Sequence, residues 1–268
     1  MTRIAIAIDA DRRALPDSGT AAWLIARKEA GELLLSPRGL AWLATVAVVL
    51  SGFAVLLVGD TELGLLDNAQ IVYDMDAIAI AVAALIAIVA GVDAIGGERE
   101  RGSLVPLLLT PVTRGALLFG KLGGLLAAWI ATFAITLPYL WAVGSTGQNL
   151  ATGIAALLVL GTPLVLAFGA FALGLGARVG TVAGALASAL AVLVLAGSPV
   201  VIGPGLRRTA IGALFDLVNP FAAVLNAIDA VVIDSERLAA QGLAFGIAAV
   251  WALAALAFAW TGLNRIAR

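Results

Sequence analysis

The longest charge-free stretch of this chain constrains its fold more than any other feature. Residues 122–177 run for 56 positions without a charged side chain. A helix needs about 20 apolar residues to cross about 30 Å of hydrocarbon, so this stretch is too long for one crossing. It has one polar interruption, Gly144-Ser-Thr-Gly-Gln-Asn149, which is a strong turn signal. The stretch therefore predicts two membrane-spanning helices joined by a turn.

The composition extends this prediction to the whole chain. Of 268 residues, 62% are hydrophobic and 12% are charged, whereas a soluble domain has about 25% charged residues. The chain has no Cys and no His, which excludes disulfides, Cys/His metal sites, a thiol nucleophile and a His general base. A net charge of −1 gives no indication of a nucleic-acid partner. We expect an all-α integral membrane protein that has no catalytic residues and binds no metal or cofactor.

Six spans fit the apolar stretches. We expect them at residues 39–59, 76–97, 116–143, 150–177, 180–204 and 240–262. Residues 21–268 would form one transmembrane domain, preceded by a flexible cytoplasmic leader at 1–20. The apolar run Ile4–Ile8 in that leader is too short for the hydrophobic region of a signal peptide.

The distribution of Lys and Arg predicts the orientation in the membrane. With the amino terminus inside, 13 of the 16 basic residues lie on the inner side. The predicted external loop 60–76 has five acidic residues and no basic one. We therefore expect a multi-pass protein of the plasma membrane with both termini in the cytoplasm.

Two segments are expected to be neither spans nor plain loops. Residues 21–35 are amphipathic and include Arg27, Lys28 and Glu29 on the polar side, so we expect a helix lying along the inner membrane surface. Ser36-Pro37 then restarts the helix. Residues 207–237 are interrupted by Asn219-Pro220, which predicts two short amphipathic or re-entrant external helices between spans five and six.

Small residues recur at four-residue spacing in two places. Gly120 and Gly124 form one such set, and Gly176, Gly180 and Gly184 form the other. This spacing allows helix backbones to approach closely in a membrane, so we expect helix packing at these positions.

The loop between spans two and three has the most informative sequence. Glu98, Arg99 and Glu100 are followed by Gly102-Ser103, which marks the start of a short helix. That helix would present Leu104, Leu107 and Leu108 on one face and end at Pro111. From the residues alone, two interpretations are equally good: a helix that docks into a groove on another protein, or one that rests on lipid head groups.

Asp93 is an ionisable residue about one turn inside the second predicted span. Such a residue is a candidate functional site. It can also form a structural pair with a nearby Arg, and both a structural role and a role in gating or proton access stay open.

The ordered set Glu98-Arg-Glu-Arg-Gly102-Ser-Leu, Leu109-Thr-Pro111-Val-Thr-Arg114 and Gly120-Lys121 resembles the signature loop of type-2 ABC transporter permeases. Ile25-Ala-Arg-Lys-Glu29 resembles the start of that family's elbow helix, and the NosY-like subfamily is the most similar. The likeness covers nearly the whole chain from about residue 21.

The resemblance implies a permease subunit of an ATP-driven exporter. Residues 103–111 would form a cytoplasmic coupling helix held by Glu98 and Glu100, which would pair with Arg residues of the loop or the elbow. Arg114 and Lys121 would fix the start of span three at head-group level. A separate cytoplasmic ATPase would bind ATP and Mg²⁺. The permease would be a homodimer in the lipid bilayer, with an external accessory protein as a further candidate partner.

The chain has no ATP-binding motif of its own. Gly115 to Lys121 imitates the spacing of a phosphate-binding loop, but Leu122 stands where such a loop needs Ser or Thr.

Two other functions remain as alternatives. An ATP-independent secondary transporter would show inverted repeats and charges at the membrane midplane, and a membrane-embedded enzyme would need converging polar groups. The sequence shows neither pattern. It leaves the cargo open among copper- or sulfur-related species, lipid and drug, although Met75 is the single candidate copper ligand beyond the initiator.

Overall fold

The computed structural model describes residues 17–59, 68–104, 106, 112–145, 149–201 and 209–266, and all regular elements in these ranges are helical. The long helices are α1 (Ser18–Leu35), α2 (Pro37–Gly59), α3 (Asn68–Val92), α6 (Arg114–Gly144), α7 (Leu150–Arg178), α8 (Val182–Val201) and α12 (Gly242–Ile266). The shorter ones are a π-helical turn (Asp93–Gly97), α4 (Glu98–Glu100), α10 (Ala210–Val218), α11 (Pro220–Val232) and a 3₁₀ turn (Leu238–Gln241). The all-α prediction is confirmed for the described residues.

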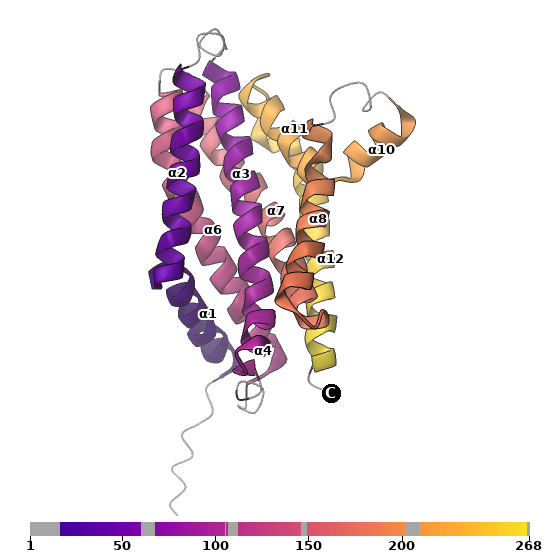
Figure 1. Ribbon diagram of the computed structural model, residues 1–268. Coiled ribbons are helices and arrows are strands. Elements are labelled where there is room, and N and C mark those ends of the chain that lie inside the picture. Colours follow the sequence, from indigo (N-terminus) through magenta and orange to yellow (C-terminus); the bar gives the residue numbers. More distant parts are fainter. Residues whose placement is uncertain are drawn as a thin grey trace, which may run out of the picture.

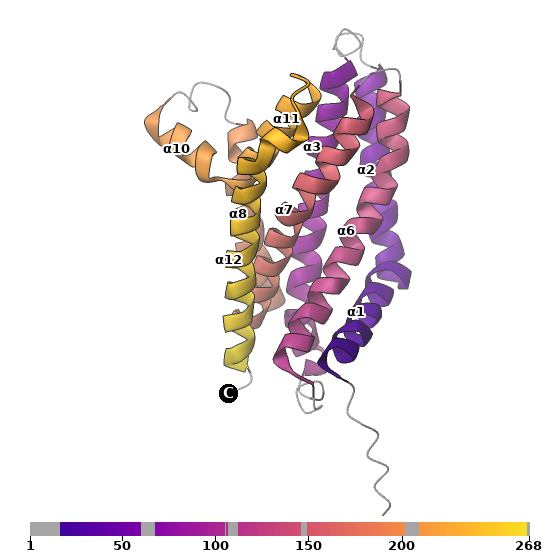
Figure 2. The same cartoon turned by 180° about the vertical axis from the view of Figure 1, so that it is seen from behind.

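The long helices form an elongated bundle with two distinct ends. Helices α1 and α4 and the carboxyl end of α12 lie at one end, and α10 and α11 lie at the other (Figures 1 and 2). We call the first the charged end and the second the far end. Helix α7 packs against both α3 and α12, so it forms the centre of the bundle.

Within the described ranges, five helices are long and apolar enough to cross a membrane. They correspond to the first, second, third, fourth and sixth predicted spans. The predicted fifth span corresponds to α8, whose apolar stretch, Val182–Ser198, is shorter than the others. Helices α10 and α11 are long and apolar enough for a crossing only when they are taken together. They are bent by 82° relative to each other, as in a broken span or a re-entrant loop. The described residues thus contain five candidate spans, or six if the bent pair α10 and α11 is counted as one span.

Side-chain caps begin two of the long helices where the sequence predicted starts. The Ser36 hydroxyl accepts a hydrogen bond from the Gly39 N–H at 3.0 Å, beside Pro37 at the first position of α2. The Thr113 hydroxyl accepts one from the Ala116 N–H at 3.2 Å and so caps α6. These caps separate α1 from α2 and position the start of α6.

Helix α1 packs directly on α6 through glycines. A Cβ atom at Gly120 would lie 2.6 Å from the Cβ of Ile25, and one at Gly124 would lie 2.6 Å from the Cβ of Glu29. Both distances are shorter than van der Waals contact, so only glycine allows this approach. The packing predicted for Gly120 and Gly124 is confirmed, and α1 is a packed part of the bundle and not only a surface helix.

The second glycine set is confirmed in part. A Cβ at Gly176 would lie 2.8 Å from the Val92 carbonyl oxygen, so α7 needs glycine there to approach α3. Gly180 has open space around it within the described structure, and Gly184 meets only side chains of its own turn. Only the first member of this set therefore joins two helices.

Helix α3 begins earlier than the second predicted span. It starts at Asn68, so Asp74 and Asp76 lie within the helix, and the prediction that both belong to an external loop is wrong. Asp76 is completely buried, next to Val72 and Gly153. Neither of its carboxyl oxygens has a hydrogen-bond partner among the described residues. The acidic residues of 60–67 lie outside the described residues.

The two short helices expected around Asn219-Pro220 are present. The Asn219 side chain accepts a hydrogen bond from the Phe221 N–H at 3.0 Å and donates one to the Ala196 carbonyl at 2.6 Å. The first bond caps α11 and the second holds the bend against α8. Helix α11 is buried along most of its length, so it is part of the core at the far end.

Candidate functional site: the charged turn and its ion pairs

The charged turn, residues 98–103, ends the long helix that starts at Asn68. Gly102 has a φ of +73°, which L side chains rarely adopt. The Ser103 N–H donates to the Glu98 carbonyl at 2.9 Å and the Gly102 N–H to the Arg99 carbonyl at 3.1 Å. This pair of bonds is the Schellman arrangement that ends helices at a glycine. Gly102 therefore ends the helix before residues 104–111 begin.

Glu98 belongs to a buried ionic cluster that joins three parts of the chain. The Lys121 ammonium on α6 lies 3.0 Å from Glu98 Oε1 and 2.9 Å from Glu29 Oε1 on α1. The Lys121 side chain is fully buried, and both carboxylates are nearly so. A buried charge is tolerated when it is paired and hydrogen-bonded. One cation between two anions thus ties the charged turn to both α1 and α6.

A second lysine lies at the exposed rim of this cluster. The Lys28 ammonium lies 3.3 Å from Glu32 and 3.9 Å from Glu98. Burial lowers the pKa of Lys28, but the carboxylates of Glu29, Glu32 and Glu98 outweigh that effect, so its pKa is raised above the ordinary value. Lys28 is therefore held in its charged form.

Arg99 and Glu100 bind the backbone where α7 ends and α8 begins. The Arg99 guanidinium donates to the carbonyls of Ala177 and Val179 at 2.8 and 2.7 Å. The Glu100 carboxylate accepts a hydrogen bond from the Val182 N–H at 2.8 Å. A cation at a helix carboxyl end and an anion at a helix amino end both match the helix dipoles. These two side chains therefore hold the connection between α7 and α8.

Arg101 pairs with Asp93 in the π-helical turn. Its guanidinium lies 3.1 Å from Asp93 Oδ1, and the Asp93 side chain folds over Gly97, where a Cβ would collide with it. Of the two roles left open for Asp93, the structural pair with a nearby Arg is present. Both side chains are about half exposed, so the pair is at the surface of the bundle.

The expected partners of the loop glutamates need correction. Glu98 and Glu100 were predicted to pair with Arg residues of the loop or elbow, but Glu98 binds two lysines and Glu100 binds a backbone N–H. Lys121 was predicted to fix the start of span three at head-group level, and its side chain is fully buried between helices. Glu29 was placed on the polar face of α1 and is also buried, while Arg27 is exposed. The reason is the close α1–α6 contact, which encloses Glu29 and Lys121 together.

Two comparisons with known proteins bear on the family of this chain. A family model described as "ABC-2 family transporter protein" matches residues 23–265. The chain belongs to this family. A protein described as "Probable ABC transporter permease protein NosY" from Stutzerimonas stutzeri is 33% identical over 157 residues, which are 56% of this chain and 50% of that protein. The match thus spans about half the length of that relative, and the chain is similar to it over that part.

Membership of the ABC-2 family supports a transmembrane part of an ABC transporter for this chain. The structure agrees that Gly115–Lys121 is no phosphate-binding loop, because these residues lie inside the continuous helix α6. Among the described residues, no three acidic side chains converge as a metal site would require.

The predicted coupling segment is described only in part. Leu104 is buried and packs with Leu117 and Leu118 of α6 and with Leu263 of α12. It is therefore a poor docking residue in this conformation, contrary to the expectation. Leu107, Leu108 and Pro111 lie outside the described residues. Arg114, the first residue of α6, donates to the Asn264 side chain at 3.1 Å and so joins α6 to the end of α12.

The sequence analysis did not predict two features of charged residues: the Glu29–Lys121 ion pair and the burial of Asp76. The Glu29–Lys121 pair could have been inferred from Gly124, since a glycine one turn after Lys121 indicates a helix packed against that face. The buried position of Asp76 had no comparable signal, because the sequence around Asp74 and Asp76 looks like the acidic end of a loop.

Proposed function

We propose that this chain is the membrane half of an ATP-driven exporter and that the charged turn transmits the movement of a separate ATPase to the helices. The turn's four charged side chains contact five different parts of the bundle. Glu98 reaches α6 and α1, Arg99 the end of α7, Glu100 the start of α8, and Arg101 the π-helical turn that follows α3. A displacement of residues 103–111 would therefore reach all of these helices at once.

The mechanism follows from the stiffness of these links. The buried Glu98–Lys121–Glu29 cluster cannot be broken without leaving charges unpaired in an apolar surrounding, which is costly. Movement of the turn would thus drag α1 and α6 together as a rigid unit. The Arg101–Asp93 pair is half exposed and less costly to break. It is the natural place for the turn to pivot against α3.

We propose that the charged end faces the cytoplasm of a cell whose plasma membrane holds the protein. Nine of the ten basic residues that the structure describes belong to segments of this end, and an excess of Lys and Arg on cytoplasmic segments is the general rule. The ATPase, with its ATP and Mg²⁺, would bind here. Two copies of the permease would form the transporter, and an external accessory protein would contact the far end around α10.

The docking part of this proposal is tested by charge at the coupling segment. Leu107→Glu and Leu108→Glu would each abolish co-purification with the ATPase and its stimulation, because a carboxylate cannot enter an apolar groove without a large desolvation cost. The control is Leu214→Glu, which puts the same charge at an exposed position of α10 at the far end. If the leucine variants kept both complex formation and stimulation, residues 103–111 would not be the docking site.

A further inference from the structure

A cavity of about 460 Å³ lies at the charged end, beside the ionic cluster. Its walls come from α1, the start of α2, the second half of α3, the middle of α6 and the start of α8. It is open at one side, since the Glu32 side chain on its rim is 60% exposed. The cavity therefore lies where the charged segments meet the apolar spans.

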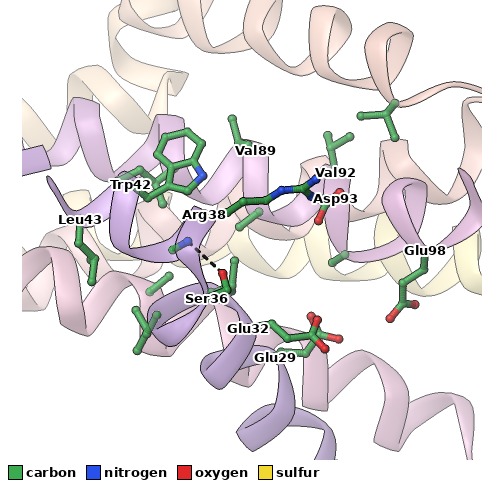
Figure 3. Close-up of a pocket in the computed structure, with 18 of the residues that line it drawn as sticks. Glu29, Glu32, Ser36, Arg38, Trp42, Leu43, Val89, Val92, Asp93 and Glu98 are labelled. Carbon is green, nitrogen blue, oxygen red and sulfur yellow. Dashed lines mark hydrogen bonds between the residues drawn. The ribbon is translucent and has the colours of Figure 1, made fainter. Parts of the chain in front are cut away.

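The lining of the cavity changes from charged to apolar along its length. Figure 3 shows Glu29, Glu32, Asp93 and Glu98 toward one end, and Trp42 and Leu43 toward the other. Ile86, Val89 and Leu186 add further apolar lining. This order matches the change in polarity from the head groups of a membrane leaflet to its acyl chains.

Two charged groups in the cavity lack a complete set of partners. Glu98 Oε1 binds both lysines, but Glu98 Oε2 is buried and has no hydrogen-bond partner in the described structure. A buried carboxylate oxygen in this position needs a donor. The Arg38 guanidinium extends toward Asp93 (Figure 3) but makes no hydrogen bond or ion pair with any described residue.

We propose that the cavity binds a phospholipid whose head group has a phosphate and a primary ammonium, as in phosphatidylethanolamine. The phosphate would lie at Arg38, the ammonium would donate to Glu98 Oε2 and Glu32, and an acyl chain would follow Trp42 and Val89. A guanidinium suits phosphate, and an ammonium has three N–H donors for carboxylates.

Other common head groups fit less well. Phosphatidylcholine has no N–H to donate to Glu98 Oε2. Phosphatidylglycerol has no ammonium to place between Glu98 Oε2 and Glu32. The binding needs no ATPase, so this proposal stands or falls independently of the coupling mechanism.

Tryptophan quenching in nanodiscs tests this site on the full-length chain. One variant keeps only Trp42, and a reference variant keeps only Trp260, which lies near the charged end of α12 and is partly exposed. The other tryptophans become Phe in each. Phosphatidylethanolamine, phosphatidylcholine or phosphatidylglycerol with brominated chains is then titrated into an unbrominated phosphatidylcholine bilayer.

We expect Trp42 to be half-quenched at about a tenfold lower fraction of brominated phosphatidylethanolamine than of either other lipid, as one charge-assisted hydrogen bond would give. Glu32→Gln should reduce this preference, because it removes a carboxylate that accepts from the ammonium. Arg38→Gln should weaken binding of all three lipids, because all three carry the phosphate. Arg265→Gln, on the exposed end of α12, should change neither. Trp260 should show no preference. Native mass spectrometry of the unsubstituted chain, with all tryptophans present, should show the same lipid selectivity and its reduction in Glu32→Gln.

Three results would overturn the proposal. Equal quenching of Trp42 by all three lipids would mean ordinary contact with the bilayer. Equal affinity for phosphatidylglycerol would mean that the ammonium contacts do not exist. Displacement of the brominated lipid by soluble phosphoethanolamine at equimolar concentration would mean that the site takes a free head group and not a lipid.

Discussion

Lys121 on α6 and Glu29 on α1 form a buried ion pair with 2.9 Å between the ammonium and the carboxylate, although 92 positions separate them in the chain. Glu98 shares the same ammonium. The second half of α1, the charged turn and α6 are thus joined at Lys121. The stability of these ion pairs determines whether α1, α6 and the charged turn move together.

Lys121→Met should destabilise the protein strongly. The change leaves Glu29 and Glu98 buried without their shared cation, and breaking a buried pair in this way costs about 3–5 kcal/mol. Thermal unfolding in detergent measures it. The triple variant Lys121→Met, Glu29→Gln and Glu98→Gln removes all three charges and should recover most of the loss. A single Lys121→Met variant as stable as the parent would show that the cluster is not essential to the fold.

Gly124→Ala should detach α1 from α6. The new Cβ would lie 2.6 Å from the Glu29 Cβ, and overpacking of this kind costs about 1–3 kcal/mol. Protease sensitivity of α1, together with the unfolding temperature, provides the measurement. Gly52→Ala on α2 is the matched control, because nothing lies within 4 Å of a Cβ there. That control should be neutral or slightly stabilising, and equal effects at the two positions would contradict the packing.

Gly102→Ala should weaken the charged turn through its backbone. At φ +73° an L side chain costs about 1–2 kcal/mol, and Gly102→Asn should cost less because Asn tolerates this conformation. Hydrogen exchange of residues 98–103 would detect the loosened turn. Gly31→Ala, in the middle of α1 with free space around it, should not change that exchange. The order of the two Gly102 variants is decisive: an Asn variant worse than the Ala variant would argue against the backbone explanation.

Asp76→Ala should cost little or no stability despite the complete burial of Asp76. Its carboxyl oxygens have no hydrogen-bond partner within the described ranges, so removing them loses no bond and relieves desolvation. Val72→Ala, one turn earlier on α3 and also buried, loses apolar packing and should lower the unfolding temperature. If Asp76→Ala were the more damaging change, Asp76 would have a stabilising partner in the folded protein.

The sequence alone predicted most of the helices. Charge-free stretches have the length of a membrane crossing, and Ser36-Pro37 and Asn219-Pro220 marked real boundaries because caps and proline act locally. The start of α3 was missed because Asp74 and Asp76 resemble loop residues, and only contacts from α7 and α11 explain the buried helix there.

The candidate site was predicted in its residues but not in its contacts. The family pattern singled out Glu98, Arg99, Glu100 and Lys121, yet a pattern along the chain does not show which side chains meet. Glu29 and Lys121 come together because Gly120 and Gly124 let two helices touch. Such a pairing depends on the tertiary structure and cannot be read from local residue types.

The central claim, that the charged turn transmits work from the ATPase to the helices, has a direct test. The double variant Arg99→Ala and Glu100→Ala removes the contacts with the ends of α7 and α8 while leaving the buried cluster and residues 103–111 unchanged. Reconstituted with its ATPase, it should bind that subunit with unchanged affinity, but stimulation of ATP hydrolysis should fall about tenfold, the effect of a coupling free energy of about 1.4 kcal/mol. The control Glu236→Gln, at the far end, should keep full stimulation. If the double variant bound and stimulated the ATPase as the parent does, the charged turn would not be the coupling element.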